Sequence, residues 1–449
     1  MKGHSIALAA VMAAGLAAAQ PAGAQNLVVS GARVIVGDGQ VIENGSVVVS
    51  GGKIASVAAG APRDVPSGAT RIDGTGFTVI AGYIDDHRHL IQGRSPEQVD
   101  AFLKGPAADR MRELLEAGFT TIQSGGDNDA GIVQLKKMVE SGQIKGPRVI
   151  TSGRVPVGQL KSEEETRAMV RKVIAAGADS IAEVHFPLAE PPNPPTLQET
   201  RNLTAAIDEA LKSNVEFQVH AVSPEALRAA IYAGARRLIH TPHYGWLSDA
   251  DAKLVASAGA KVSSCTGFGA PVFDVFNHDN KPTFRDGKPW PEGIIDGQGR
   301  GREAGYKPVN GRTLFDNGVV YGFCTDTTYY GPAAFMHELR VLSLVFSPVD
   351  LVTILGKNSA DVINMSKEIG TLEVGKRGDL LVLTGNPLEG AWNFGTPVVV
   401  AKDGVVLVDK RSQLKTVRVL PAQRPPLPPT PAGPPRGAAP GGPQPPPAE

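Results

Sequence analysis

The chain has 449 residues, 42% of them hydrophobic and 5% aromatic, and its 45 Lys and Arg balance 45 Asp and Glu. A net charge of zero gives no global field to hold a polyanion, so we expect no nucleic acid as a partner. The two cysteines, Cys265 and Cys324, are too few for a disulfide framework, and neither has the C-x-x-C spacing of a zinc or redox site. We therefore expect burial alone to hold the fold together, with Cys324 as a small buried filler.

Both ends of the chain are predicted to lie outside the fold. Residues 1–24 combine Lys2, an apolar run and a small-residue site ending at Ala24, which together predict a secretory signal peptide. The apolar run is too short to span a bilayer, so we expect a secreted or periplasmic protein without a stable membrane anchor. Residues 421–449 contain 13 of the 36 prolines and predict a disordered Pro-rich tail.

Short β-rich runs follow the predicted signal peptide. Over residues 25–80 they are separated by glycine turns, as at Gly51-Gly52, and predict a small antiparallel sheet. Similar β-rich runs return over residues 368–415, near the other end of the chain. We therefore expect one composite β-sandwich domain that is formed by both segments.

Between these segments, residues 81–367 alternate helices with short apolar strands. Examples are MRELLEAG before FTTIQSGG and PEALRAAIYAGA before RRLIHTP. This alternation is typical of parallel β/α units, and about eight such units predict a closed barrel. The expected fold is thus α/β, a (β/α)8 TIM-type barrel with the composite sheet domain beside it.

The active site of such a barrel lies at the carboxyl ends of its strands. GYIDDHRHL places His87 and His89 two residues apart and therefore on one face, while later strands end in His220, His240 and Asp326. Nitrogen and oxygen ligands suit a divalent metal, Zn2+ foremost, and we expect one or two ions per chain. Such a site lowers the pKa of bound water to about 7, and Asp326 is the expected proton shuttle.

These motifs resemble the metal-dependent amidohydrolase superfamily, in the branch of imidazolonepropionase and the secreted Xaa-Pro dipeptidases. The likeness covers nearly everything from Asn26 to about Lys410. Its markers are ARVIVGDGQVIENGSVVVSGGKIASV, GYIDDHRHL, KGPRVITSGR, QVHAVSPEALRAAIYAGARRLIH, GFCTDT and IGTLEVGKRGDLLVLTGNPL.

The resemblance implies roles for the residues at the strand ends. His87 and His89 would bind the more buried metal, and His220 and His240 the more exposed one. Asp326 would contact the buried metal and carry the proton as a catalytic residue.

One position departs from the pattern of the superfamily. A carboxylated lysine on strand four usually bridges two metals in a G-A-D-x-I-K segment, and GADSIAE places Ala182 in its slot. Glu183 is the expected substitute as a metal ligand, although strand alternation turns it away and only a bulge would re-aim it. His185 shares the parity of Glu183 and is expected beside it.

A second arrangement stays open if strand four supplies no ligand. A single metal on the remaining ligands, with His240 acting on the substrate, would be similar to adenosine and cytosine deaminases, but their glutamate is replaced here by Ser223. A binding protein without catalysis is a further alternative.

The expected partner is a small molecule with an amide bond, such as an N-acyl amino acid, a dipeptide or a cyclic amide. Lactones and phosphotriesters are alternative substrates, because the same hydroxide attacks them. His185, His243 and Tyr329 are the expected substrate contacts. The sequence is also compatible with a homo-oligomer.

Overall fold

The computed structural model describes residues 25–93, 95–189, 193–267, 301–326 and 331–414. The chain divides into two compact units, Met1–Lys410 and Arg411–Glu449, and the described part of the second unit contains the short helix η5 (Arg411–Gln413). The expected signal peptide, the expected Pro-rich tail and Tyr329 lie outside the described residues. Within those residues, no helix combines the length and apolar character needed to cross a membrane.

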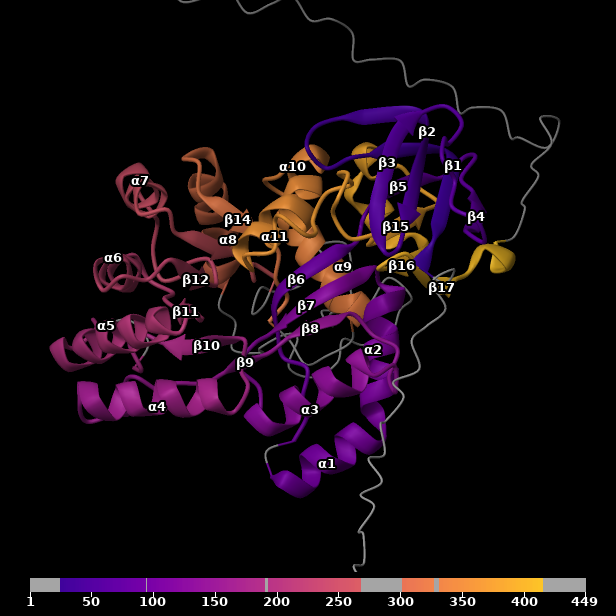
Figure 1. Ribbon diagram of the computed structural model, residues 1–449. Helices are drawn as coiled ribbons and strands as arrows, with labels where there is room; N and C mark the ends of the chain where they lie inside the picture. Colours follow the sequence, from indigo (N-terminus) through magenta and orange to yellow (C-terminus); the bar gives the residue numbers. More distant parts are fainter. Residues whose placement is uncertain (1–24, 94, 190–192, 268–300, 327–330, 415–449) are drawn as a thin grey trace, which may run out of the picture. The chain divides into compact units, whose positions relative to one another are not determined.

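Both ends of the first unit contribute strands to one eight-stranded sheet, seen in Figure 1 as indigo and yellow strands side by side. The order is β17-β16-β15-β5-β1-β2-β3, and β4 pairs with β1 off this path. The strands are β1 (Leu27–Ile35), β2 (Val41–Ser50), β3 (Lys53–Ala59), β4 (Thr70–Asp73), β5 (Thr78–Ala81), β15 (Leu380–Leu383), β16 (Pro397–Lys402) and β17 (Val405–Asp409).

Valine and isoleucine dominate these strands because β-branched side chains pack well on a pleated surface. Their buried side chains, among them Val29, Ile54 and Val382, form a core of their own. The runs that predicted a small antiparallel sheet, β1, β2 and β3, do pair antiparallel, whereas β4 and β5 pair in parallel with β1. The chain has to cross the sheet after β3 to reach the other side of β1, and a crossover of this kind leaves strands parallel.

The second set of strands is parallel throughout. β6-β7-β8 form one ladder and β9 to β14 form another. Their bounds are β6 (Tyr83–Arg88), β7 (Phe119–Ser124), β8 (Arg148–Ile150), β9 (Ser152–Gly153), β10 (Ser180–His185), β11 (Glu216–His220), β12 (Arg237–Ile239), β13 (Lys261–Ser263) and β14 (Val320–Gly322).

Backbone hydrogen bonds join the two ladders into one barrel of eight strands, counting β8 and β9 as one. β8 and β9 are successive parts of one position, separated only by Thr151. The N–H of Asp86 donates to the Phe323 carbonyl at 2.9 Å, and the N–H of Asp326 donates to the His87 carbonyl at 3.0 Å. These bonds link β6 to the end of β14. The expected (β/α)8 barrel with a second domain from both chain ends is thereby confirmed.

Helices follow the barrel strands, and Figure 1 shows α4, α5 and α6 beside β10 and β11. Ser95, Thr196 and Ser248 begin helices with capping boxes, which satisfy N–H groups that a helix leaves without partners. The helices are α1 (Pro96–Lys104), α2 (Pro106–Glu116), α3 (Asp129–Glu140), α4 (Glu163–Ala175), α5 (Leu197–Lys212), α6 (Pro224–Tyr232), α7 (Asp249–Ser257), α8 (Gly301–Asp316), α9 (Gly331–Leu342), α10 (Pro348–Thr353), η2 (Ile354–Asn358), α11 (Ser359–Val362), η3 (Pro387–Glu389) and η4 (Ala391–Gly395).

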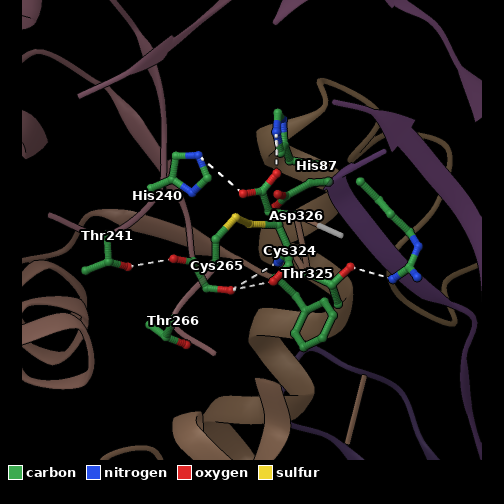
Figure 2. The surroundings of a disulfide bond; sticks show 12 residues. His87, His240, Thr241, Cys265, Thr266, Cys324, Thr325 and Asp326 are labelled. Carbon is green, nitrogen blue, oxygen red and sulfur yellow. Dashed lines mark hydrogen bonds and ion pairs between the residues drawn. A yellow bond between two sulfur atoms is a disulfide. The ribbon is translucent and has the colours of Figure 1, made fainter. Parts of the chain in front are cut away.

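The two cysteines form a disulfide bond, shown in Figure 2. Cys265 follows β13 and Cys324 follows β14, and their Cα atoms are 4.9 Å apart although 59 positions separate them in the chain. The prediction that burial alone holds the fold, with Cys324 as a filler, was therefore wrong. The pairing depends on β13 and β14 being neighbours, which the spacing in the sequence does not reveal.

Candidate metal centre

The carboxyl ends of five barrel strands bring imidazoles and carboxylates together. His87 lies on β6 with His89 just beyond it, β10 carries Glu183 and His185, and the ends of β11, β12 and β14 are followed or closed by His220, His240 and Asp326. Figure 2 shows His87 and His240 pointing toward the Asp326 carboxylate, close to the disulfide.

The backbone at these strand ends is unusual. Glu183, His240 and Asp326 have φ angles of 56°, 68° and 47°, and Cys265 beside them has 42°. Elsewhere in the described residues, every other non-glycine residue with positive φ is Asn or Asp, the types that tolerate this conformation best. Each such residue costs on the order of 1–3 kcal/mol, and strain of this kind clusters at functional sites.

The first group of candidate ligands contains His87, His89, Glu183 and Asp326, with one donor atom from each within 4.8 Å of the others. His87 Nε2 lies 3.0 Å from Glu183 Oε2 and 3.4 Å from Asp326 Oδ1. His89 Nε2 lies 3.4 Å from the same Asp326 oxygen. Two imidazoles and two carboxylates therefore converge on one point.

Glu183 reaches this point through a β-bulge. The pairing of β10 with β11 shifts register between Ile181 and Val184, where Ala182 and Glu183 lie opposite Gln218 alone, so Glu183 escapes the normal alternation. Gly126, after β7, leaves the necessary room, because a Cβ on it would lie 3.0 Å from the Glu183 Cβ. The structure thus contains the bulge that the sequence argument required.

The second group of candidate ligands contains Glu183, His185 and His220. Glu183 Oε1 lies 3.0 Å from His185 Nε2 and 3.3 Å from His220 Nδ1. The two imidazole rings stack with their centroids 4.3 Å apart. Since Oε2 of the same carboxylate faces His87, Glu183 is shared by both groups.

His240 lies next to these groups but belongs to neither. Its ring centroid is 4.3 Å from that of His220, and its Nε2 is 3.7 Å from Asp326 Oδ2. This buried nitrogen has no hydrogen-bond partner among the described residues. His243 is buried nearby, where burial, followed by the charges of Lys307 and His240, holds its pKa well below the ordinary value.

Two polar residues that the sequence analysis missed orient the histidines. His87 Nδ1 lies 3.3 Å from the amide oxygen of Gln218, and His89 Nδ1 lies 3.3 Å from Asp127 Oδ1. A donor bond from Nδ1 leaves Nε2 as the atom that can bind a metal, and such partners fix the orientation of the ring. Gln218 lies two residues before His220 and therefore on the same face of β11, and Asp127 follows the Ser-Gly-Gly at the end of β7. Both are polar residues at the carboxyl end of a strand, so the sequence pattern could have identified them.

The charges of the centre depend on one another. Burial opposes ionisation of Glu183, but hydrogen bonds from its three histidine neighbours hold its pKa well below the ordinary value. Burial likewise opposes protonation of His87, yet hydrogen bonds with Asp326 and Glu183 raise its pKa to about 10. In the metal-free chain, therefore, a protonated His87 lies between the carboxylates of Glu183 and Asp326.

This donor set fits a divalent metal. All donors are imidazole nitrogen or carboxylate oxygen, which zinc and similar ions accept. Gly125 keeps the space between donors open, because a Cβ on it would come within 3.0 Å of both His87 Nε2 and His89 Cε1. The groups of His, Glu and Asp side chains are thus able to hold a metal.

Comparisons with known proteins agree with the barrel and its site. The profile of the amidohydrolase family matches residues 78–407, so the chain belongs to this family. It is 24% identical over 432 residues to the imidazolonepropionase of Alkaliphilus metalliredigens, covering 82% of this chain and 92% of that protein.

Solved structures agree with the fold. A putative prolidase from Bifidobacterium longum superimposes with a TM-score of 0.68 at 25% identity, covering 86% of this chain and 96% of the other. Phenylurea hydrolase B has a TM-score of 0.69 at 18% identity, covering 88% of this chain and all of the other. The chain is therefore a hydrolase that acts on carbon–nitrogen bonds, and its family is metal-dependent.

Proposed function

We propose that this protein hydrolyses an amide bond in a small molecule, such as a dipeptide or an N-acyl amino acid, with two divalent ions, Zn2+ foremost, at the candidate metal centre. The observation that carries the proposal is the Glu183 carboxylate, whose two oxygens face separate ligand groups. A carboxylate in this position is chemically close to the carbamate of a carboxylated lysine. Glu183 thereby replaces the bridging ligand that Ala182 cannot supply.

The names of the relatives support an amide substrate. They include an imidazolonepropionase, a putative prolidase and a Xaa-Pro dipeptidase. When bound, the divalent ions would lower the pKa of water to about 7 and polarise a carbonyl group.

The side chains of the centre do the rest of the chemistry. Asp326 Oδ1 lies within 3.4 Å of both His87 and His89, so one oxygen of this carboxylate reaches the point where the donors converge. From there Asp326 takes a proton from the attacking water and delivers it to the departing nitrogen. The buried His240, 3.7 Å from the other oxygen of Asp326, is placed to hold the second ion or the substrate carbonyl.

We also propose that the protein is secreted or periplasmic. The predicted signal peptide supports this location, and so does the bond between Cys265 and Cys324, because disulfides persist in oxidising compartments. Fractionation of the cell of origin, with N-terminal sequencing of the mature chain, tests it. A chain that stays in the cytoplasm with its first 24 residues attached would contradict it.

Metal analysis is the first test of the catalytic proposal. We expect two ions per chain in protein purified without chelators, and hydrolysis of dipeptides or N-acyl amino acids that chelation abolishes. One ion per chain would favour the single-metal arrangement, and none after reconstitution would favour a binding protein.

The second test substitutes Asp326→Asn. We expect kcat to fall at least about a hundredfold, the lower scale for loss of a general acid or base. Metal content is measured in parallel, so that loss of an ion is distinguished from loss of the proton carrier. Near-normal turnover by the variant would remove Asp326 from the mechanism.

A further inference from the structure

A cavity of about 270 Å3 adjoins the candidate metal centre. Glu183 and His185 line it on the side of the centre, and Arg154, Pro156 and Leu188 line it elsewhere. This volume is slightly below the range of about 300–1,000 Å3 for pockets that hold drug-sized ligands. It suits one amino-acid residue rather than a long peptide.

Arg154 is held in place at the mouth of the barrel. It follows β9 directly, and its backbone N–H donates a hydrogen bond to Asp129. Its side chain begins beside Gly126, where an added Cβ would lie 3.0 Å from Arg154 Cγ and 3.0 Å from Glu183 Cβ. Gly126 therefore allows the stem of Arg154 to lie close to the shared carboxylate.

Among the described residues, no close ion pair neutralises the charge of Arg154. Within the described residues, no salt bridge joins its exposed side chain to a carboxylate. Its charge acts on the pKa of Asp129 through a longer-range electrostatic interaction. The Glu183 carboxylate in the same cavity is engaged by its histidine neighbours. Arg154 thus brings a positive charge to the cavity that adjoins the candidate metal centre.

We propose that Arg154 binds the free carboxylate of the substrate, which makes the substrate class N-acyl amino acids and dipeptides with an unblocked C-terminus. This inference rests on the proposed function and deepens it. A guanidinium pairs with a carboxylate through two parallel hydrogen bonds, a geometry that lysine cannot reproduce. With the carboxylate held there, the side chain of the same residue meets Pro156 and Leu188, and its acylated nitrogen faces Glu183 and His185.

The test compares Arg154→Gln with the wild type on matched substrates. Each dipeptide or N-acetyl amino acid is assayed beside its C-terminal carboxamide. We expect kcat/KM for the free acids to fall about ten- to hundredfold in the variant, mainly through KM, the scale for a hydrogen bond to a charged group. The carboxamides should change less than about twofold. Arg154→Lys should recover only part of the loss.

Two controls isolate the carboxylate contact. Lys161→Gln removes a positive charge from the same connecting segment without lining the cavity, and it should change neither substrate series. Metal content should be unchanged in every variant. Equal loss on acids and carboxamides would mean a structural role for Arg154, and no loss on either would also overturn the proposal.

A binding measurement separates this inference from the proposed function. If the wild type hydrolyses neither series, the proposed function fails, and calorimetry with free proline and leucine on the zinc-loaded protein still tests Arg154. Binding that Arg154→Gln weakens at least about tenfold supports the carboxylate site. Equal binding by variant and wild type, or no binding by the wild type, overturns it.

Discussion

Removal of the Cys265–Cys324 bond should destabilise the protein by an amount that the structure allows to be worked out. Both cysteines are fully buried, and the bond closes a loop across 59 positions of the chain. In the chain-entropy account, a bridge of this span lowers the conformational entropy of the unfolded chain and so raises the free energy of unfolding by about 4 kcal/mol at 25 °C. Cys265→Ala, Cys324→Ala and the double variant should each lose a free energy of this order.

The assay is urea unfolding followed by tryptophan fluorescence and far-UV circular dichroism. Both probes are needed because a free energy of unfolding is defined only where their transitions coincide. Free energies are compared rather than midpoints, since an unbridged unfolded chain exposes more surface and steepens the dependence on urea.

The three variants test each other. Either single substitution breaks the same bond, so each should lower the free energy of unfolding nearly as much as the double substitution does. The effects of the two single substitutions should therefore not add. A double variant that costs the sum of the two single variants would refute the reasoning. Free thiols are also counted in the wild type unfolded in urea without a reducing agent. Two free thiols per chain would show that the bond does not form.

The remaining predictions concern the metal centre and the buried histidines around it. Glu183→Gln should reduce the bound metal from two ions to one, whereas Glu216→Gln at the opposite end of neighbouring β11 should leave it unchanged; equal metal content in both variants would argue against bridging. At pH 7 the metal-free chain holds protons on His87, whose pKa is about 10, and on His89, whose pKa is also raised. Metal binding should therefore release protons, measured by calorimetry in buffers of different ionisation enthalpy, and metal affinity should fall as pH falls. The raised pKa of His87 also stabilises the metal-free fold below about pH 6.5, and that stability should be lost as pH rises through about 10. Buried His243 acts in the opposite direction, because its lowered pKa means that stability should fall as pH drops below about 6.5, and His243→Gln should flatten this part of the profile.

The sequence was sufficient to predict the barrel and most residues at its carboxyl end. Alternating helices and apolar strands predicted the parallel units, and polar residues that close apolar strands pointed to His87, His220 and Asp326. These features are local, and a parallel barrel brings all such strand ends to one face. The structure does place these three side chains close to one another.

Other parts of the site depend on contacts that no local pattern encodes. The direction of Glu183 is set by a register shift against β11 and by the absence of a side chain on Gly126. The sequence analysis could state only that a bulge would be required. The pairing of Cys265 with Cys324 depends in the same way on two strands being neighbours in space.

The composite sheet has a consequence for the order in which the chain is made. β5 pairs with β1 on one side and with β15 on the other, and β15 is synthesised after the entire barrel. Until Leu380–Leu383 have emerged, the apolar strand Thr78–Ala81 has an open edge. Exposed edges of this kind pair with other chains, so a growing or partly exported chain is most prone to aggregate before its last strands arrive. Ribosome stalling or truncation shortly before Leu380 should therefore yield insoluble protein, even though the barrel sequence would be complete.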